Sequence, residues 1–349
     1  MLSSPPSIFA IEALPELMQI EVLKNLTLHQ LYRFSRGSRR CRQMVALMKH
    51  HVHIEIDLSY SGKTMRLVPT NGEQPLKWEF QTDVAANGSM YGAIGQPVPP
   101  RKPAAELLTA EHKMGIKLAH LIEAFRCPVR KFDFNGEAVN HWRSVFTRFR
   151  QCEELIVRGG RTDDACLQYI LENIRVTRRF EIRYWTSRQV RCSNRIFNCD
   201  QLDLGNAPWM NREHLMGMKC ATADISGVWF TKQDLADFVS KWYHSDDTRL
   251  QCVHFFLAVE MNDFELEEGI PTKSWDLRER GPVYRVSRHK KIDCRKGMDI
   301  ERNDGLLATV ISEERHFKFV VWHNRFPRIP DLSNAAPAQP RWPVWQGLW

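Results

Sequence analysis

Hydrophobic residues recur at helical spacing in three short runs within the first fifty residues of the chain. Pro15 stands where the first helix would begin, a position at which the backbone N–H is not needed. Thr27 and Gln30 form a capping-box pattern for a second helix, and Ser38 can cap a third. The pattern therefore predicts three consecutive helices between residues 9 and 50.

The three predicted helices hold more apolar side chains than such short helices can bury among themselves. The surplus is expected either to bind a partner protein or to pack against the remainder of the chain. Around the first two helices, the apolar positions are Leu14, Leu17, Ile20, Leu23, Leu26 and Leu31.

From residue 51 the apolar positions change to the alternation that is typical of β-strands. Three strands are predicted at His51–Tyr60, Thr64–Pro69 and Leu76–Phe80, and a loop rich in Gly and Pro follows at Ala85–Pro103. Beyond residue 104, predicted helices alternate with predicted strands. The centres of six strands recur at intervals of 22 to 28 residues, at Phe132, Leu155, Phe180, Leu202, Ile225 and Val253.

A strand-plus-helix unit that recurs at this interval is typical of a leucine-rich-repeat-like solenoid, in which each unit buries its apolar face against its neighbours. We therefore expect an α/β fold with a parallel sheet and helices on the outer face. The expected divisions are a three-helix unit at 9–50, strands and the Gly/Pro-rich loop at 51–103, and the repeat at 104–322.

The end of the chain has a different pattern. Three antiparallel strands are predicted at Asp299–Arg302, Ala308–Ser312 and Phe317–Trp322, with a turn signal between the first two. These strands are expected to close the open edge of the parallel sheet. Residues 323–349 are rich in Pro and aperiodic, and we expect them to be disordered.

The chain has 349 residues and a formal net charge of +8. The excess is mostly arginine and is concentrated at residues 33–42 and 175–195. Such clusters favour an acidic partner, either a nucleic acid or an acidic protein, although a solvated surface explains them equally well. No apolar run approaches the length of a membrane span, and the N-terminus lacks the basic start of a signal peptide. We therefore expect a protein of the cytoplasm or nucleus that has no membrane partner.

Nine cysteines occur without any C-x-x-C pair. This argues against a disulfide framework and against a zinc site, and it fits a reducing compartment. Cys127, Cys152, Cys199 and Cys220 each stand just before or at the start of a predicted strand, where a small apolar residue suits the interior of a repeat. Nucleotide-binding, serine-hydrolase and metalloprotease motifs are absent from the sequence. We therefore expect neither enzymatic activity nor a metal or cofactor.

Residues 14–45, LPELMQIEVLKNLTLHQLYRFSRGSRRCRQMV, resemble the F-box motif in their Leu-Pro opening, apolar spacing and Ser-x-x-Ser-Arg-Arg stretch. Cys41 replaces the Trp of many F-boxes, and Gly37 replaces an aliphatic residue. F-boxes dock onto the Skp adaptor of Skp–cullin–F-box ubiquitin ligases. The resemblance therefore implies a Skp-type adaptor, and through it a cullin, as partners. The adaptor-binding residues that it implies are Leu14, Pro15, Leu17, Ile20, Leu23, Leu26 and Leu31.

A second set of motifs lies in the other half of the chain. A Phe-x-Cys-x-x-Leu-x-Leu strand at Phe197–Leu204 is followed by Trp209 and by a Thr-x-x-Asp-Leu helix at Thr231–Trp242. In these features, and in its ending at residues 299–322, the chain resembles the type-two F-box-associated domain of the large nematode F-box families. Ala236 replaces an Asn that the family usually has, which removes one side-chain hydrogen bond.

Two functional hypotheses follow. In the first, the chain is a substrate receptor of a ubiquitin ligase, which binds the adaptor through the F-box and a target protein through the solenoid. In the alternative, the arginine-rich body binds nucleic acid, which leaves the Leu-Pro helix unexplained. The target would contact side chains that alternate with the buried strand centres, together with tryptophans after strands, for which core packing is equally compatible. These candidate residues are Asp133, Arg183, Asp203, Trp209 and Trp229.

Overall fold

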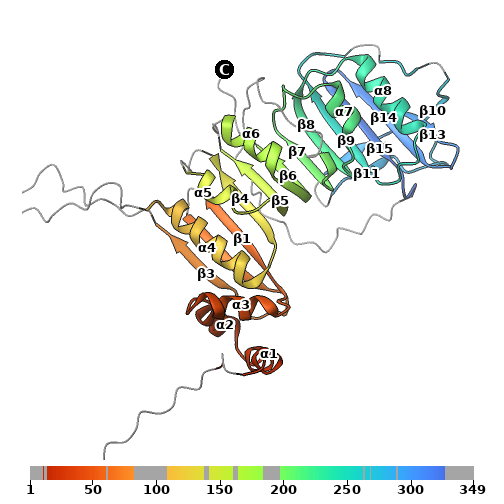
Figure 1. Ribbon diagram of the computed structural model, residues 1–349. Coiled ribbons are helices and arrows are strands. Elements are labelled where there is room, and N and C mark those ends of the chain that lie inside the picture. The colour runs from red at the N-terminus through yellow and green to blue at the C-terminus, as the bar shows by residue number, and fades with distance from the viewer. Residues whose placement is uncertain are drawn as a thin grey trace, which may run out of the picture.

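In the computed structural model, three helices form one end of the protein (Figure 1). The Thr27 side chain accepts a hydrogen bond from the backbone N–H of Gln30, and the Gln30 side chain accepts one from the Thr27 N–H. Ser38 likewise accepts from the N–H of Cys41. The predicted helices are present as α1 (Glu16–Lys24), α2 (Leu28–Ser35) and α3 (Arg39–Leu47).

The structure describes residues 11, 14–59, 62–81, 108–136, 141–159, 164–183, 197–261, 264–267, 269–287 and 290–326. The predicted Gly/Pro-rich loop at 85–103 lies outside the described residues, and so does the predicted disordered tail after residue 326. Part of the second arginine cluster, namely Arg188, Arg191 and Arg195, also lies outside them.

Within the described residues, one sheet of 13 strands extends along the protein (Figure 1). Its central strands are parallel and stand side by side in chain order, which confirms the parallel sheet predicted from the repeat. They are β4 (Val129–Asn135), β5 (Gln151–Arg158), β6 (Arg175–Ile182), β7 (Gln201–Leu204), β8 (Thr222–Val228) and β9 (Cys252–Leu257).

The N-terminal strands belong to the same sheet. Strand β1 (Val52–Ser59) lies parallel to β4, and β2 (Gly62–Pro69) and β3 (Leu76–Phe80) follow as antiparallel strands to the edge. The sequence pattern predicts these three strands but not their place beside β4. Pairing between segments so far apart in the chain leaves no periodic signal.

Helices cover one face of the sheet, and the main hydrophobic core lies between them and the strands (Figure 1). All six predicted strand centres are buried in this core. No helix of the described residues covers the opposite face of the sheet, which we call the helix-free face. The covering helices are α4 (Ala110–Phe125), α5 (Arg143–Phe146), α6 (Asp164–Asn173), α7 (Arg212–Gly217) and α8 (Lys232–Tyr243).

A glycine with positive φ occurs at the end of two of the parallel strands. The φ angle is 109° at Gly159, after β5, and 72° at Gly227, in β8. A Cβ atom at Gly227 would lie 2.2 Å from Oδ1 of Asn206, and one at Gly159 would lie 2.6 Å from Oδ1 of Asn135. In both cases the asparagine comes from the end of the preceding strand. Two of the repeat units therefore have the same close contact between a glycine and the asparagine side chain of the preceding unit, at a positive φ that favours glycine.

Antiparallel strands extend the sheet beyond β9. Strand β15 (His316–Val321) pairs with β9, and β14 (Leu307–Glu313), β13 (Met298–Glu301) and β10 (Thr272–Ser274) follow. The three predicted C-terminal strands are thus present, and they lengthen the sheet instead of ending it at β9. Because antiparallel strands stand at both ends, the structure supports a repeated α/β sheet, and the solenoid itself stays a prediction.

A hairpin of two short strands, β11 (Val283–Arg285) and β12 (Lys291–Asp293), covers the C-terminal part of the helix-free face. Beneath it lies a second apolar cluster that includes Cys252, Ile311 and Trp322. These side chains alternate along their strands with those that face the helices. The part of this face from β4 to β8, which we call the open part, is only partly exposed: among the described residues, Ile156 and Glu181 are buried, whereas Asp133, Asp203 and Asp224 keep accessible surface.

A buried ion pair fixes the segment before the hairpin to the sheet. Arg280 is 0% exposed, and its Nε donates a hydrogen bond of 2.8 Å to Oδ2 of Asp299. Asp299 also accepts from Oγ1 of Thr309, which in turn accepts from Nε1 of Trp322. The Trp322 ring lies 5.0 Å from the guanidinium of Arg280. Every polar group of this network has a partner, as a buried charge requires.

Candidate functional site

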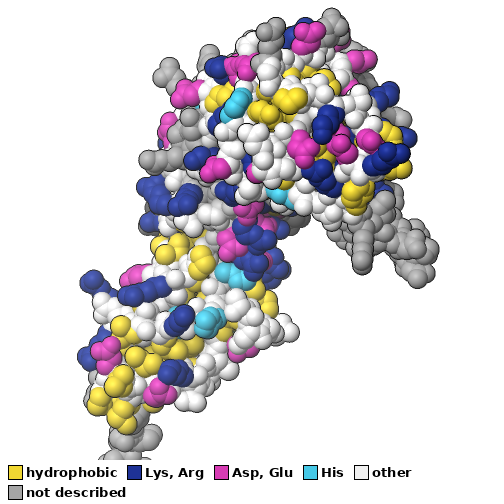
Figure 2. All heavy atoms as spheres, turned by 90° about the vertical axis from the view of Figure 1, so that its right-hand side faces the viewer, with side chains coloured by type: hydrophobic (Ala, Val, Ile, Leu, Met, Phe, Trp, Pro, Cys, Tyr) yellow, Lys and Arg dark blue, Asp and Glu magenta, His cyan; other side chains and the backbone are white. Residues whose placement is uncertain are grey.

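Helix α1 presents apolar side chains to solvent. Leu17 is 78% exposed, Met18 is 55% exposed, and Val22 and Pro15 are exposed as well. We call these four residues the α1 patch. Figure 2 shows hydrophobic side chains gathered at this end of the molecule. Contiguous exposed apolar groups commonly mark a surface that binds another protein.

The residues implied as adaptor-binding differ in exposure. Leu23 and Leu31 lie in the main core, at 0% and 6% exposed. For these two the predicted contact with a partner is corrected, because helical spacing identifies apolar positions but not which of them face the body. The other five keep accessible surface: Pro15 and Leu17 are exposed, and Leu14, Ile20 and Leu26 are half-buried.

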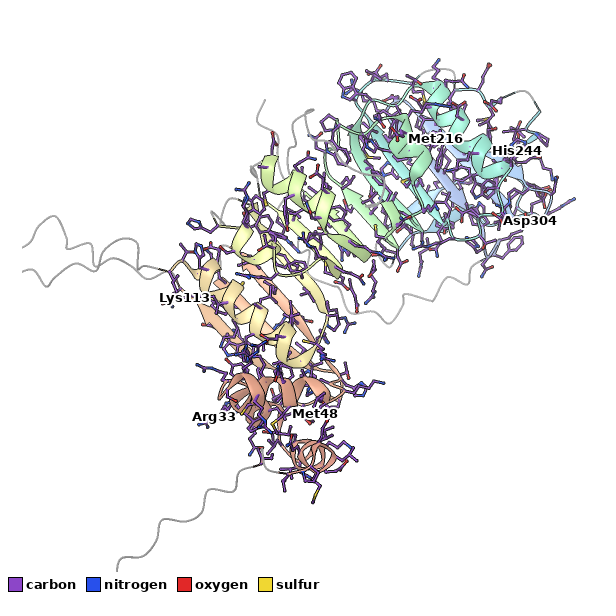
Figure 3. All side chains as sticks on the ribbon, viewed as in Figure 1. Arg33, Met48, Lys113, Met216, His244 and Asp304 are labelled. Atoms are coloured by element: carbon purple, nitrogen blue, oxygen red, sulfur yellow. The ribbon has the colours of Figure 1, made fainter. Side chains whose placement is uncertain are left out.

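Helices α2 and α3 pack on the body of the protein. The Tyr32 ring of α2 lies 5.0 Å from the Trp78 ring of β3. Nη1 of Arg42 in α3 donates a hydrogen bond of 2.9 Å to Glu123 in α4. The apolar residues of the N-terminal segment are therefore divided: those of α2 and α3 are mostly buried, apart from Leu47, whereas α1 presents most of its own to solvent, apart from Leu23. Figure 3 shows this segment, with Arg33 and Met48, far from the end that carries Met216, His244 and Asp304.

Carboxylates line up across the helix-free face, because residues in one register stand side by side in a sheet. The line passes through β1, β4, β6, β7 and β8, and Ile156 occupies the same position on β5. Like charges in such positions repel one another, so the line needs nearby cations. We call it the acidic row: Asp57, Asp133, Glu181, Asp203 and Asp224.

Arginines flank the acidic row. Nε of Arg158 donates a hydrogen bond of 3.1 Å to Asp133. Nε of Arg183 lies 2.6 Å from Glu181, and its Nη2 lies 3.5 Å from Asp203. The predicted residues Asp133, Arg183 and Asp203 thus lie on one face, where Arg183 is exposed and the two aspartates are half-buried. In Figure 2, acidic and basic side chains stand together between the two ends of the molecule.

The predicted aspartates carry charge in an unfavourable setting. Burial raises the pKa of the Asp133 carboxyl, and Arg158 offsets this only in part. Burial also raises the pKa of Asp203, and the neighbouring carboxylates of Glu181 and Asp224 add to the increase. Each ionised aspartate is therefore less stable in the folded protein than in water.

Asp224 differs from Asp203, its neighbour in the acidic row, because two side chains donate hydrogen bonds to it. Nδ1 of His254 lies 2.9 Å from its Oδ1, and Lys290 contacts its Oδ2. Burial raises the pKa of Asp224, but the hydrogen bonds from His254 and Lys290 outweigh it and hold the pKa at about 2. Nε2 of His254 lies 3.0 Å from Nδ1 of His316. Because a carboxylate only accepts hydrogen bonds, Nδ1 of His254 carries a proton.

The two candidate tryptophans have opposite environments. Trp229 is 47% exposed, whereas Trp209 is 7% exposed and lies against the ring of His214 at 5.8 Å. Of the two alternatives that the sequence leaves open for Trp209, the structure has core packing, and its candidate role in target binding is corrected. Trp209 comes just before α7, and that helix packs over it, so its position after a strand does not place it on the surface.

The described residues bear on metal binding and on thiol chemistry. They contain no cluster of three or more His, Cys, Asp or Glu side chains that could hold a metal ion. The cysteines predicted to lie in the core, Cys127, Cys152, Cys199 and Cys220, are all buried. Burial raises the pKa of Cys127 and of Cys152 to about 12, so these thiols stay protonated and are poor nucleophiles.

A hollow of about 550 Å³ opens on the helix-free face over β1, β2 and β3. Its lining is largely charged and polar, and it includes Asp57, Arg66, Lys77 and Glu79. Small-molecule sites are usually lined by apolar side chains, so this hollow is better suited to a polar surface contact. None of the helices in the described part of the chain is both long enough and apolar enough to cross a membrane.

Comparison with known proteins finds a family match for one segment in the C-terminal half of the chain. Residues 193–255 match the family described as "F-box associated". This segment spans β7, α7, β8 and α8 and reaches into β9. No solved structure matches the chain.

Three uncharacterized proteins of Caenorhabditis elegans are similar in sequence. F59B2.8 is 23% identical over 370 aligned positions, which cover 95% of this chain and 81% of that protein. F59B2.9 is 34% identical over 143 positions, or 39% of this chain and 33% of that protein. F54H12.5 is 27% identical over 128 positions, or 35% of this chain and 36% of that protein. Together with the family match, these similarities support an F-box-associated domain in this chain.

Proposed function

We propose that this protein is a substrate receptor of a Skp–cullin–F-box type ubiquitin ligase. The N-terminal helices bind the adaptor, and the sheet binds a target protein. The adaptor connects the chain to a cullin. The receptor holds its target close to the charged conjugating enzyme and contributes to the reaction by proximity, which requires no catalytic residue of its own.

The observation that carries this proposal is the α1 patch. A side chain as apolar as Leu17 at 78% exposure is unfavourable in water unless a partner covers it. Most apolar residues of α2 and α3 are buried, although Leu47 of α3 is 49% exposed, so most of the exposed large apolar side chains of the three helices belong to α1. The F-box-associated match at residues 193–255 is consistent with an adaptor-binding role for α1, α2 and α3, which we call the head.

The charge arrangement favours a protein target over a nucleic acid. The arginines of the helix-free face stand beside carboxylates, as Arg158 does beside Asp133 and Arg183 beside Glu181 and Asp203. A phosphate backbone needs uncompensated positive charge, and the acidic row would repel it. Mixed charge with nearby exposed aromatic side chains such as Trp229 is typical of a protein-binding surface. The target-binding residues that we propose are Asp133, Arg183, Asp203 and Trp229.

Co-purification of the full chain with a Skp-type adaptor tests the proposal. Leu17→Asp should reduce adaptor capture at least tenfold, because it places a charge in the centre of an apolar contact. Ile116→Asp is a matched control, since Ile116 is a 58% exposed apolar residue on α4, outside the head. The control should retain adaptor binding.

Salt dependence separates this proposal from the nucleic-acid alternative. An apolar contact through α1 should persist when the salt concentration rises, whereas binding to an RNA oligonucleotide would fall steeply. Capture of the adaptor that is equal in the Leu17→Asp and Ile116→Asp variants would contradict the proposed role of the head.

A further inference from the structure

On the helix-free face, the side chains change from carboxylates to small residues and then to an aromatic ring between β7 and β9. On this face, Gly205 is the next residue after Asp203, and Ser226 is the next residue after Asp224. Both have minimal side chains. The residue of β9 in register with Ser226 is Phe256, which is 38% exposed. A shallow floor of small residues therefore separates the carboxylates from an exposed aromatic ring.

Asp203 is the least compensated member of the acidic row in this area. Glu181 on one side is held by Arg179 and Arg183, and Asp224 on the other side by His254 and Lys290. Within the described residues, the closest cationic contact of Asp203 is Nη2 of Arg183 at 3.5 Å, which is longer than a hydrogen bond. The pKa of Asp203 is raised, first by burial and then by the carboxylate of Glu181. A cation supplied by a ligand would relieve this repulsion.

Apolar side chains gather at the carboxyl ends of β8 and β9. Trp229, Phe256 and Val259 are 47%, 38% and 45% exposed. Trp229 stands between Val228 and Phe230, both buried in the main core, and it therefore points away from that core. The N–H of Ala258 donates a hydrogen bond of 2.8 Å to the carbonyl of Val228, which ties the two strand ends together. Exposed aromatic residues on a fixed backbone are suited to act as binding hot spots.

We propose that this surface binds an extended segment of a protein in which a lysine or arginine stands about four residues from an aromatic or large aliphatic side chain. The cation contacts Asp203, and the apolar side chain contacts Phe256 and Trp229. That the bound protein is a target for ubiquitination rests on the proposed function, whereas the preferred chemistry rests on this surface alone.

Sheet geometry sets the spacing. Asp203 is in register with Asp224 on β8 and with His254 on β9. Phe256 therefore lies two strands from Asp203 and two residues further along the strand direction. With strands about 4.8 Å apart and a rise of about 3.3 Å per residue, the two positions are separated by about 12 Å. Four residues of extended chain span about the same distance and place both side chains on one side of the segment.

Selection from a displayed library of random twelve-residue peptides on the purified full chain tests this inference. Enriched peptides should carry Lys or Arg about four positions from Trp, Phe or Leu. The dissociation constant of one enriched synthetic peptide is then measured by fluorescence polarisation. Asp203→Asn should weaken binding about tenfold, and Phe256→Ser should weaken it similarly. Glu213→Gln, which removes an exposed charge from α7, is the matched control and should leave binding unchanged.

A charge reversal makes the test specific. Asp203→Lys should bind the same peptide with its cation replaced by Glu more tightly than the original peptide. Thermal unfolding of each variant establishes that the fold is intact.

Several outcomes would overturn the inference. They are enrichment of peptides without a cation, equal affinity of the Asp203→Asn variant, and self-association of the chain that Asp203→Lys abolishes. Binding of an RNA oligonucleotide that Phe256→Ser abolishes would overturn it as well. Adaptor capture is measured separately. Peptide selection without adaptor binding would refute the ligase proposal alone, and adaptor binding without peptide preference would refute this inference alone.

Discussion

Arginine–aspartate pairs occur in two parts of the helix-free face, and their surroundings are opposite. Beside hairpin β11–β12, the side chains of Arg280 and Asp299 are 0% and 1% exposed and are satisfied by a complete hydrogen-bond network. On the open part, the Arg158 side chain that pairs with Asp133 is 53% exposed. The same chemistry therefore fixes the fold in the covered part and presents charge to the surroundings in the open part.

The comparison is tested most strongly by removing one arginine from each part. Arg280→Ala leaves the Asp299 carboxylate buried without its cation, and the free energy of unfolding should fall by about 3–5 kcal/mol. Arg158→Ala should reduce it by less than about 1 kcal/mol, since exposed ion pairs contribute little. Urea denaturation followed by circular dichroism measures both. Equal losses in the two variants would mean that the open pair is structural as well.

Local patterns predict the head well because they act over a few residues. The capping box at Thr27 and Gln30 and the spacing of leucines place three helices correctly. The same spacing does not distinguish Leu17, which is exposed, from Leu23, which is fully buried. That difference depends on which side of α1 packs on α3, and a contact between separate helices has no signal in a helical period.

The repeat predicts the parallel sheet because each strand is followed along the chain by its own neighbour. Strand alternation also places Asp133, Arg183 and Asp203 on one face. It does not reveal that Glu181 and Asp224 share their line, since this depends on register between strands. The hairpin β11–β12 escapes prediction because strands of three residues are too short for a period.

Asp224 lies at the border between the two parts, since Lys290 reaches it from beside the hairpin. Its pKa of about 2 is below the ordinary value of 3.8, so its ionised form stabilises the folded state. This stabilisation is present above about pH 4 and is lost as the pH falls through 2. Asp224→Asn should reduce the free energy of unfolding at pH 7 by about 1 kcal/mol, a value lowered for solvent screening because the side chain is 41% exposed.

Urea denaturation of the unsubstituted chain and of the Asp224→Asn variant at pH 7 and pH 3 measures this effect. The difference between their free energies of unfolding should be smaller at pH 3. Lys290→Ala should remove part of the same stabilisation. The double variant should therefore lose less than the sum of the two single losses. Simple additivity, or a gap that widens in acid, would contradict the contact between Asp224 and Lys290 as the cause.

Asp203 stands one strand away from Asp224 in the same register. Neutralising Asp203 is expected to change the free energy of unfolding in the opposite direction. Its pKa is raised, mainly by burial and then by Glu181, so its ionised form destabilises the folded state at neutral pH. Asp203→Asn should therefore raise the free energy of unfolding at pH 7 by a few tenths of a kcal/mol. The gain should vanish in acid, where Asp203 of the unsubstituted chain is protonated in both the folded and the unfolded state. Urea denaturation at pH 7 and pH 3 measures it beside the Asp224→Asn variant. A loss of stability as large as that of Asp224→Asn would assign Asp203 a structural role. A gain in stability together with weaker peptide binding would instead mean that the fold tolerates an unfavourable charge because a ligand uses it.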